Sequence, residues 1–286
     1  MTRSSGPGKL ATVARSEHHT GYWRVKLVLH YEGRDFHGWQ IQEDRRTVQG
    51  ELSALLRRIC GEGSRKLTAA GRTDAGAHAT GQVASALIPV RFDEGELLRA
   101  LNALAPPDLW IASAERVPDS FHPRYDAVSR TYIYRVGVDH RSGSPFQAPW
   151  CWPLGRALDL ELMVDATHCI IGDHDFSAFA KSGQPLRGVR CEVLAAEWSV
   201  APQAEGILEF EITADRFLHR MVRYLVGTLV EIGQRFRPVD DMARLLGVEP
   251  GVKAAPPAPA QGLFLARVEY STDYTEDRAR GQGGSE

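Results

Sequence analysis

Two hydrophobic periodicities alternate along this chain, and their order constrains the fold more than any other feature. The segment 23–33 alternates apolar and polar residues and is rich in β-branched residues, which predicts a half-buried strand. The segment 47–61 instead spaces its leucines as a helix does, with Thr47 as the N-cap and Gly61 as the C-terminal stop. Strands and helices therefore follow one another closely from the start of the chain.

The same mixture of elements occurs twice, although the sequence itself does not repeat. We expect strands at 23–33, 65–71 and 82–90 and helices at 47–61 and 93–106 in the first half. In the second half we expect strands at 129–138, 190–201, 206–215 and 262–270 and helices at 157–172, 217–234 and 239–248. Helices that could all lie on one face of their strands indicate an α+β fold.

The fold class that we predict is α+β, with two similar halves, each an antiparallel or mixed sheet with helices on one face. The two sheets join into one extended sheet around a central basic cleft. The predicted organisation is a flexible tail at 1–20, an N-terminal half at 21–120, a C-terminal half at 121–271 and a flexible tail at 272–286.

The charge balance gives no simple sign of a nucleic-acid partner. The net charge is −2 with a pI near 6.6, whereas a nucleic-acid-binding domain is commonly strongly basic. Acidic residues concentrate in the predicted helices, however, and arginines gather near the motifs described below, so we expect a basic site on an acidic body. These arginines are Arg72, Arg124, Arg130, Arg216, Arg220 and Arg223.

The cysteines indicate neither a metal site nor a disulfide framework. Cys60, Cys151, Cys169 and Cys191 are far apart and form no CxxC pair. No stretch approaches the roughly 18 apolar residues of a membrane span, and the N-terminus lacks the apolar core of a signal peptide. We therefore expect a soluble cytoplasmic protein with no membrane association.

A glycine-punctuated loop at 69–83 gathers Arg72, Thr73, Asp74 and His78 between two predicted strands. Such a loop is a common place for a catalytic carboxylate. An isolated Asp-x-Gly is more often a simple turn, but the dense polar cluster around it favours a site. His78 has no other metal ligand at suitable spacing, which favours a structural histidine.

Two further segments carry candidate RNA-binding side chains. Period-two alternation places Arg130, Tyr132 and Tyr134 on one face of a strand, where they could clamp a base or simply cover the core. In the predicted helix 217–234 an apolar stripe at Phe217, Met221, Leu225 and Leu229 lies beside a stripe of three arginines. Arg216, Arg220 and Arg223 at i, i+4 and i+7 would repel one another unless an anion compensates, although a solvated face stays an alternative.

These segments resemble the successive signatures of the tRNA pseudouridine synthase A family. The matching segments are 31–40, 69–83, 121–136, 172–179, 217–233 and 261–270, in the family's order, and the GRTDAG-x-H block is the most specific of them. The resemblance extends from about Trp23 to Tyr270. It implies isomerisation of uridine to pseudouridine at positions 38, 39 and 40 of the tRNA anticodon stem-loop, by a homodimer that needs no cofactor and no metal.

The resemblance also implies residue roles. Asp74 corresponds to the catalytic aspartate, acting as nucleophile or base, and Arg223 to the arginine that pairs with it. Arg72 corresponds to the arginine that displaces the target base, and Tyr132 to the tyrosine that packs on the uracil. We add Arg130 and Arg220 as substrate-binding candidates.

This sequence departs from the family pattern at a few positions. Arg220 is often His in the family, Tyr224 is often Asn, and Ala105 replaces a usual Leu. These changes bear on tRNA preference and leave the reaction's residues in place. A non-catalytic RNA-binding module would have no need for Asp74 among anionic ligands, and a metal-dependent hydrolase would need a His or carboxylate cluster that the sequence lacks.

Overall fold

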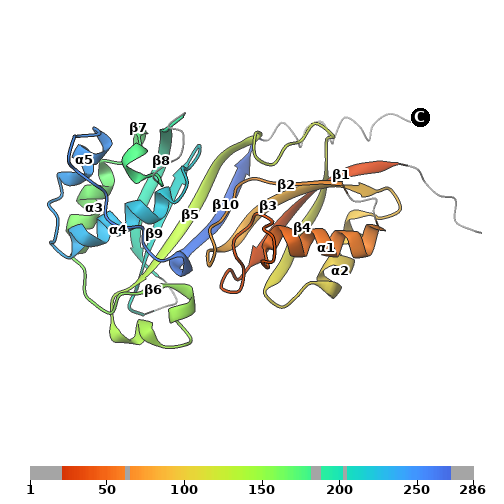
Figure 1. Ribbon diagram of the computed structural model, residues 1–286, viewed down its shortest axis with the longest axis horizontal. Coiled ribbons are helices and arrows are strands. Elements are labelled where there is room, and N and C mark those ends of the chain that lie inside the picture. Colours follow the sequence, from red (N-terminus) through yellow and green to blue (C-terminus); the bar gives the residue numbers. More distant parts are fainter. Residues whose placement is uncertain (1–20, 62–64, 182–187, 202–204, 272–286) are drawn as a thin grey trace, which may run out of the picture.

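The computed structural model describes residues 21–61, 65–181, 188–201 and 205–271. Both predicted tails lie outside the described residues. The described strands are β1 (Tyr22–Tyr31), β2 (Arg65–Ala69), β3 (His78–Pro89), β4 (Leu109–Val117), β5 (Ala127–Gly137), β6 (Trp152–Pro153), β7 (Gly172–Asp175), β8 (Arg190–Val200), β9 (Ile207–Ala214) and β10 (Leu263–Tyr270). They form one mixed sheet in the order β4-β1-β3-β10-β5-β9-β8-β7, with β2 on β3 and β6 on β5 (Figure 1).

Helices cover one face of this sheet in two groups. In the first half these are α1 (Val48–Cys60) and α2 (Glu94–Leu104), and in the second α3 (Leu160–His168), α4 (Met221–Gly233) and α5 (Asp241–Leu246). The helices of each group pack on the strands beneath them and enclose a separate apolar core. Tyr132 packs against both cores, and its register partner Leu265 belongs to the first, so both groups lie on the same face. The predicted α+β architecture with one extended sheet is confirmed.

The last strand of the chain joins the two halves. β10 runs parallel to β3, with Phe264 opposite His78, and antiparallel to β5, with Leu263 opposite Tyr134. In Figure 1 this blue strand lies in the middle of the sheet, between strands of the first and second halves. The two sheets are thus continuous through β10.

The sequence pattern missed β4, β6 and β7 and misplaced the bounds of several other elements, such as the helix expected at 157–172, which is α3. β4 lies at the edge of the sheet, and its alternation is weak because Trp110 is half exposed and Ala112 and Ser113 interrupt the apolar face. β3 begins already at His78. The helix predicted from residue 217 begins only at Met221.

Local signals in the sequence set the helix ends as predicted. The Thr47 hydroxyl accepts a hydrogen bond of 3.2 Å from the backbone N–H of Gly50, and Gly61 ends α1 with a φ of 69°. Asp93 caps α2 in a reciprocal capping box with Glu96. No helix among the described residues is both long and apolar enough to cross a lipid bilayer.

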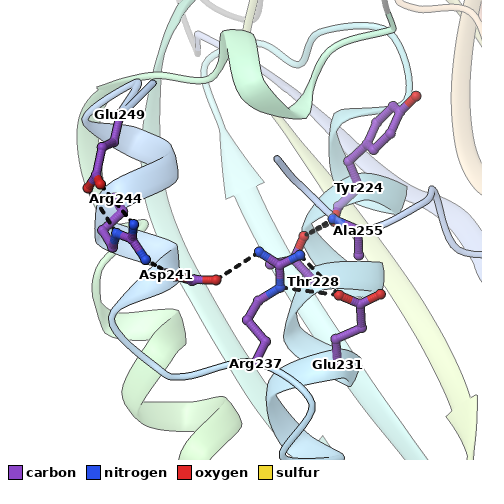
Figure 2. A network of polar contacts seen from close by, with 8 residues as sticks. All are labelled: Tyr224, Thr228, Glu231, Arg237, Asp241, Arg244, Glu249 and Ala255. Atoms are coloured by element: carbon purple, nitrogen blue, oxygen red, sulfur yellow. Dashed lines mark hydrogen bonds and ion pairs between the residues drawn. The ribbon is translucent and has the colours of Figure 1, made fainter. Parts of the chain in front are cut away.

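Polar contacts fix α4 against its neighbours (Figure 2). Arg237 donates to Glu231 on α4 at 3.1 Å and to Asp241 on α5 at 3.0 Å. Arg244 extends this network, because it donates to both Asp241 and Glu249. Because Arg237 and Asp241 are largely shielded from water, this network ties α5 to the C-terminal half of α4.

The other side of α4 holds the proline-rich segment 254–261, which we call the strap. The Thr228 hydroxyl accepts a hydrogen bond of 3.1 Å from Ala255 N–H and donates to the Tyr224 carbonyl at 2.9 Å (Figure 2). A Cβ on Gly227 would stand 2.3 Å from the carbonyl oxygen of Pro256. The strap therefore lies directly on the α4 backbone.

Replacing Gly227 by alanine is expected to lower the free energy of unfolding by about 1–3 kcal/mol, because the added methyl group must displace the strap. Gly95→Ala is the matched control, since its Cβ would meet only side-chain atoms, Arg99 Nη1 at 3.3 Å and Asp93 Oδ1 at 3.4 Å. Denaturant unfolding of both variants measures the effect. Equal stability of the two variants would contradict the close packing of the strap.

Candidate active site

The loop between β2 and β3 carries Asp74 and is clamped by the loop that follows β1. Trp39 N–H donates to the Thr73 carbonyl at 3.1 Å, and Gly76 N–H donates to the Phe36 carbonyl at 3.2 Å. Phe36 and Trp39 are themselves buried in the first core. The Asp74 backbone is thus held on both sides by a segment with its own apolar anchors.

Glycines allow these two loops to approach so closely. A Cβ on Gly33 would lie 1.9 Å from the Ala77 carbonyl oxygen, and one on Gly38 would lie 2.7 Å from that of Thr73. Gly38 also has a φ of 87°, in the region that favours glycine. Gly33 and Gly38, in the loop after β1, therefore allow that loop to hold the Asp74 loop in position.

Three side chains from the start of α4 and the segment before it converge on the Asp74 carboxylate. Arg223 Nη1 donates to Oδ2 at 2.5 Å. His219 Nε2 lies 3.2 Å from Oδ1, and Arg220 Nε lies 3.7 Å from Oδ2. The structure thus brings Asp74 of the first half against Arg223 of the second, as expected.

Arg223 is held by a second contact that fixes its direction. Its Nε donates to the Ala258 carbonyl at 2.6 Å, and Ala258 N–H donates back to the Arg223 carbonyl at 2.9 Å. The Arg223 side chain is only 12% exposed, and that of Asp74 is 16% exposed. Charge-assisted bonds so shielded are strong and directional, so the carboxylate has a defined orientation.

The predicted stripe of three arginines on one helical face is wrong. α4 begins at Met221, and Arg220 has a left-handed φ of 66°, so the chain turns before the helix starts. Arg216 is exposed and lies outside the helix. Arg220 and Arg223 nevertheless both reach Asp74, because the sharp turn directs Arg220 inward. The anion that lies against the guanidinium groups of Arg220 and Arg223 is the Asp74 carboxylate.

Tyr132 lies at the boundary of the two cores, on the helix-covered face of β5. Its ring packs edge to face on Phe217, with centroids 4.9 Å apart. Burial raises the pKa of Tyr132 to about 12, and the nearby Asp74 charge adds to the rise. The ring is therefore a neutral, rigid surface beside the carboxylate. Tyr134 instead lies fully buried in the second core and donates to the strap at the Pro259 carbonyl.

His219 is a site residue that sequence reasoning overlooked. It precedes Arg223 by four positions, the spacing that places two residues on one side of a helical turn, and this signal was available. Its side chain is 41% exposed, more than that of Arg223, so His219 lies between the Asp74 carboxylate and solvent.

The two remaining arginine candidates differ in their surroundings. Arg72 is exposed and has no ion pair or hydrogen bond with any described residue. Arg130 is half buried and donates to the backbone carbonyls of Arg124, Ala127 and Asp215, at 2.6–3.1 Å. Arg130 thus braces the backbone beside the site, and its contact with substrate stays a prediction.

His78 has the structural role that the sequence favoured. It is 1% exposed, its Nδ1 accepts from Gly33 N–H at 3.0 Å, and its Nε2 lies 3.1 Å from the Gln261 carbonyl. Burial lowers its pKa, so it is held as a neutral ring. Among the described residues no group of three or more His, Cys, Asp or Glu side chains is placed to hold a metal ion.

Comparison with known proteins agrees with this geometry. A family model described as tRNA pseudouridine synthase matches residues 27–126 and 166–271, which include the Asp74 loop and α4. The chain belongs to the tRNA pseudouridine synthase family. Family membership makes the protein an isomerase that acts on tRNA.

The chain is similar to several proteins named tRNA pseudouridine synthase A. It is 40% identical over 248 residues to one from Moorella thermoacetica, covering 86% of this chain and 99% of the relative. It is 40% identical to one from Methylobacterium radiotolerans, covering 86% and 98%, and 36% identical to one from Bordetella petrii, covering 91% and 96%. A solved Cbf5-Nop10-Gar1 complex matches at 9% identity with a TM-score of 0.32, covering 84% of this chain and 57% of that one.

Burial of tyrosines predicts the alkaline limit of stability. Tyr132 is buried neutral with a pKa of about 12, and the pKa values of Tyr31 and Tyr134 are also raised by burial. Their stabilising contribution is fully present below pH 10 and is lost as the pH rises through the folded-state values. We expect the free energy of unfolding to fall above pH 10, and to fall less steeply in Tyr132→Phe. Denaturant unfolding at pH 8–12 measures this, and identical slopes would contradict it.

Proposed function

We propose that this enzyme converts uridine to pseudouridine at positions 38, 39 and 40 of the tRNA anticodon stem-loop, with Asp74 as the catalytic group. The observation that supports this most directly is the Asp74 carboxylate held 2.5 Å from Arg223 Nη1 and shielded from water. The family model that spans both segments supports the reaction class.

The reaction breaks the N1–C1′ glycosidic bond, turns the uracil while it is held and joins C5 to C1′. It then removes the C5 proton, while N1 takes up a proton, so that the product is an isomer of the substrate. Asp74 can serve by attacking C1′ or by removing the 2′ proton to give a glycal. Both roles need the ionised carboxylate. Arg223 donates to the carboxylate and orients the oxygen that must reach the sugar.

The remaining site residues receive the base. The target uridine is stacked in a stem and must be flipped out, at a cost of a few kcal/mol. Arg72 is exposed and unpaired among the described residues, so it is available to enter the vacated stack. Tyr132, supported by Phe217, offers an aromatic face on which the flipped uracil packs.

The charge around Asp74 favours an anionic ligand. Two guanidinium groups, those of Arg220 and Arg223, face one carboxylate, which leaves an excess of positive charge. Arg220 Nε is buried without a hydrogen-bond acceptor among the described residues. A phosphate of the flipped nucleotide would supply that acceptor and compensate the excess charge. Arg130 holds the adjoining backbone and completes the proposed substrate-binding set.

We propose that the enzyme acts in the cytoplasm as a homodimer that uses no cofactor and no metal. The family resemblance supports each of these points. The chemistry agrees, since a carboxylate and a flipped base suffice for an isomerisation in which no atom is gained or lost. Light scattering of the purified chain measures its oligomeric state.

Asp74→Asn is expected to abolish pseudouridine formation on an unmodified tRNA transcript, because the amide can neither attack C1′ nor accept the 2′ proton effectively. Binding of tRNA is expected to stay close to that of wild type. Base-resolution mapping of pseudouridine at positions 38–40 and a binding titration provide the two measurements. Retained turnover would remove Asp74 from the mechanism, and loss of wild-type activity in chelator would favour a metal-dependent reaction.

Arg223→Lys is expected to lower kcat by at least about a hundredfold, because lysine cannot bind Asp74 and the Ala258 carbonyl together as the guanidinium does. His219→Ala, which removes a more exposed partner of the same carboxylate, is expected to lower kcat by only about tenfold. Single-turnover rates at saturating enzyme measure both. A larger loss for His219→Ala would reverse the assigned order.

A further inference from the structure

A compact turn between β4 and β5 presents an exposed aromatic ring to solvent. We call residues 122–126 the HPRYD turn. Tyr125 in this turn is 77% exposed, and its ring lies on the His122 ring with centroids 4.3 Å apart. An exposed aromatic ring that is held in a defined position presents a face on which the base of a nucleic acid can stack.

The turn is rigid. His122 N–H donates to the Asp126 carboxylate at 2.7 Å, and Asp126 N–H donates to the His122 carbonyl at 3.1 Å. His122 Nδ1 accepts from the backbone N–H groups of Arg124 and Tyr125. Tyr270 anchors the turn from β10 by donating to the Pro123 carbonyl. The position of Tyr125 is therefore defined before any ligand arrives.

Arg130 connects the turn to the active site. Its Nη2 donates to the Arg124 carbonyl at 2.6 Å, and its Nη1 donates to the Asp215 carbonyl at 2.6 Å. Arg130 lies two residues from Tyr132 on the same face of β5, a spacing of roughly 7 Å along the strand. Arg130 thus links the backbone of the turn to the strand that carries Tyr132.

The charge of the turn fits a nucleic acid. Arg124 is exposed, its guanidinium lies 6.0 Å from the centre of the Tyr125 ring, and no carboxylate among the described residues pairs with it. The only carboxylate within the turn, that of Asp126, is occupied by a backbone N–H. An aromatic face beside a free guanidinium is the combination that binds a base and its phosphate.

We propose that the HPRYD turn is a second tRNA contact of this enzyme, in which an unpaired base stacks on Tyr125 and a phosphate binds Arg124. The proposal rests on the proposed function, because the same tRNA must occupy the Asp74 site. The turn would fix the tRNA while the target uridine is flipped, and would take no part in the bond changes. Its loss should therefore weaken binding and leave the chemical step intact.

Equilibrium titration of an unmodified tRNA transcript tests this, in the Asp74→Asn background so that no turnover occurs. Tyr125→Ala is expected to raise Kd about tenfold or more, and Tyr125→Phe, which keeps the ring, is expected to bind like its parent. Arg124→Ala is expected to raise Kd and to lower the slope of log K against log salt by about one. Phe236→Ala is the matched control, since Phe236 is 73% exposed beyond the far end of α4.

With Asp74 intact, single-turnover rates of Tyr125→Ala at saturating enzyme are expected to equal those of wild type. An unchanged Kd for Tyr125→Ala would overturn the proposal. A changed mass in light scattering with unchanged affinity would also overturn it and would assign the turn to contact with a second copy of the chain. If wild type itself forms no pseudouridine on the transcript, the proposed function fails, whereas an active wild type with unaffected variants refutes only the turn.

Discussion

One ion pair connects the two halves of this protein at the point where its chemistry takes place. Asp74 and Arg223 are 149 residues apart in sequence, and each is positioned by its own half. The loop after β1 clamps the backbone of Asp74, while α4 and the strap direct the Arg223 side chain. Because such a bond depends steeply on distance, the packing of both cores and the continuity of the sheet converge on this contact.

The strap contacts several residues that hold the Asp74–Arg223 pair in place. The strap accepts hydrogen bonds from Arg223 through Ala258 and from Tyr134 through Pro259, and its last residue, Gln261, contacts His78 at the start of β3. The chain then continues directly into β10, the strand that joins the halves. Residues that look like a linker by composition are therefore part of the framework of the site.

The sequence predicted the parts of this structure that local patterns control. The periodicities located most strands and helices, and the glycine-punctuated polar loop identified Asp74. It failed where a contact distant in the sequence decides the structure. The apolar pattern begins at Phe217, but the helix begins only at Met221, because the Phe217 ring packs on Tyr132 of β5. Of the carbonyls that bind Arg130, that of Asp215 comes from the residue after β9, 85 positions away, which no pattern within one segment shows.

The position of β10 has a consequence for how the molecule forms. β10 lies in the middle of the sheet and is the last of the described strands in the sequence, so the two halves cannot be joined before it has been synthesised. The first half can collapse early around its own core, but the start of β3, at His78 and Ala79, lacks its β10 partner until that strand has been made. The site is therefore complete only after β10 has been synthesised, since the segment that orients Arg223 and the strand that joins the halves follow each other directly in the sequence.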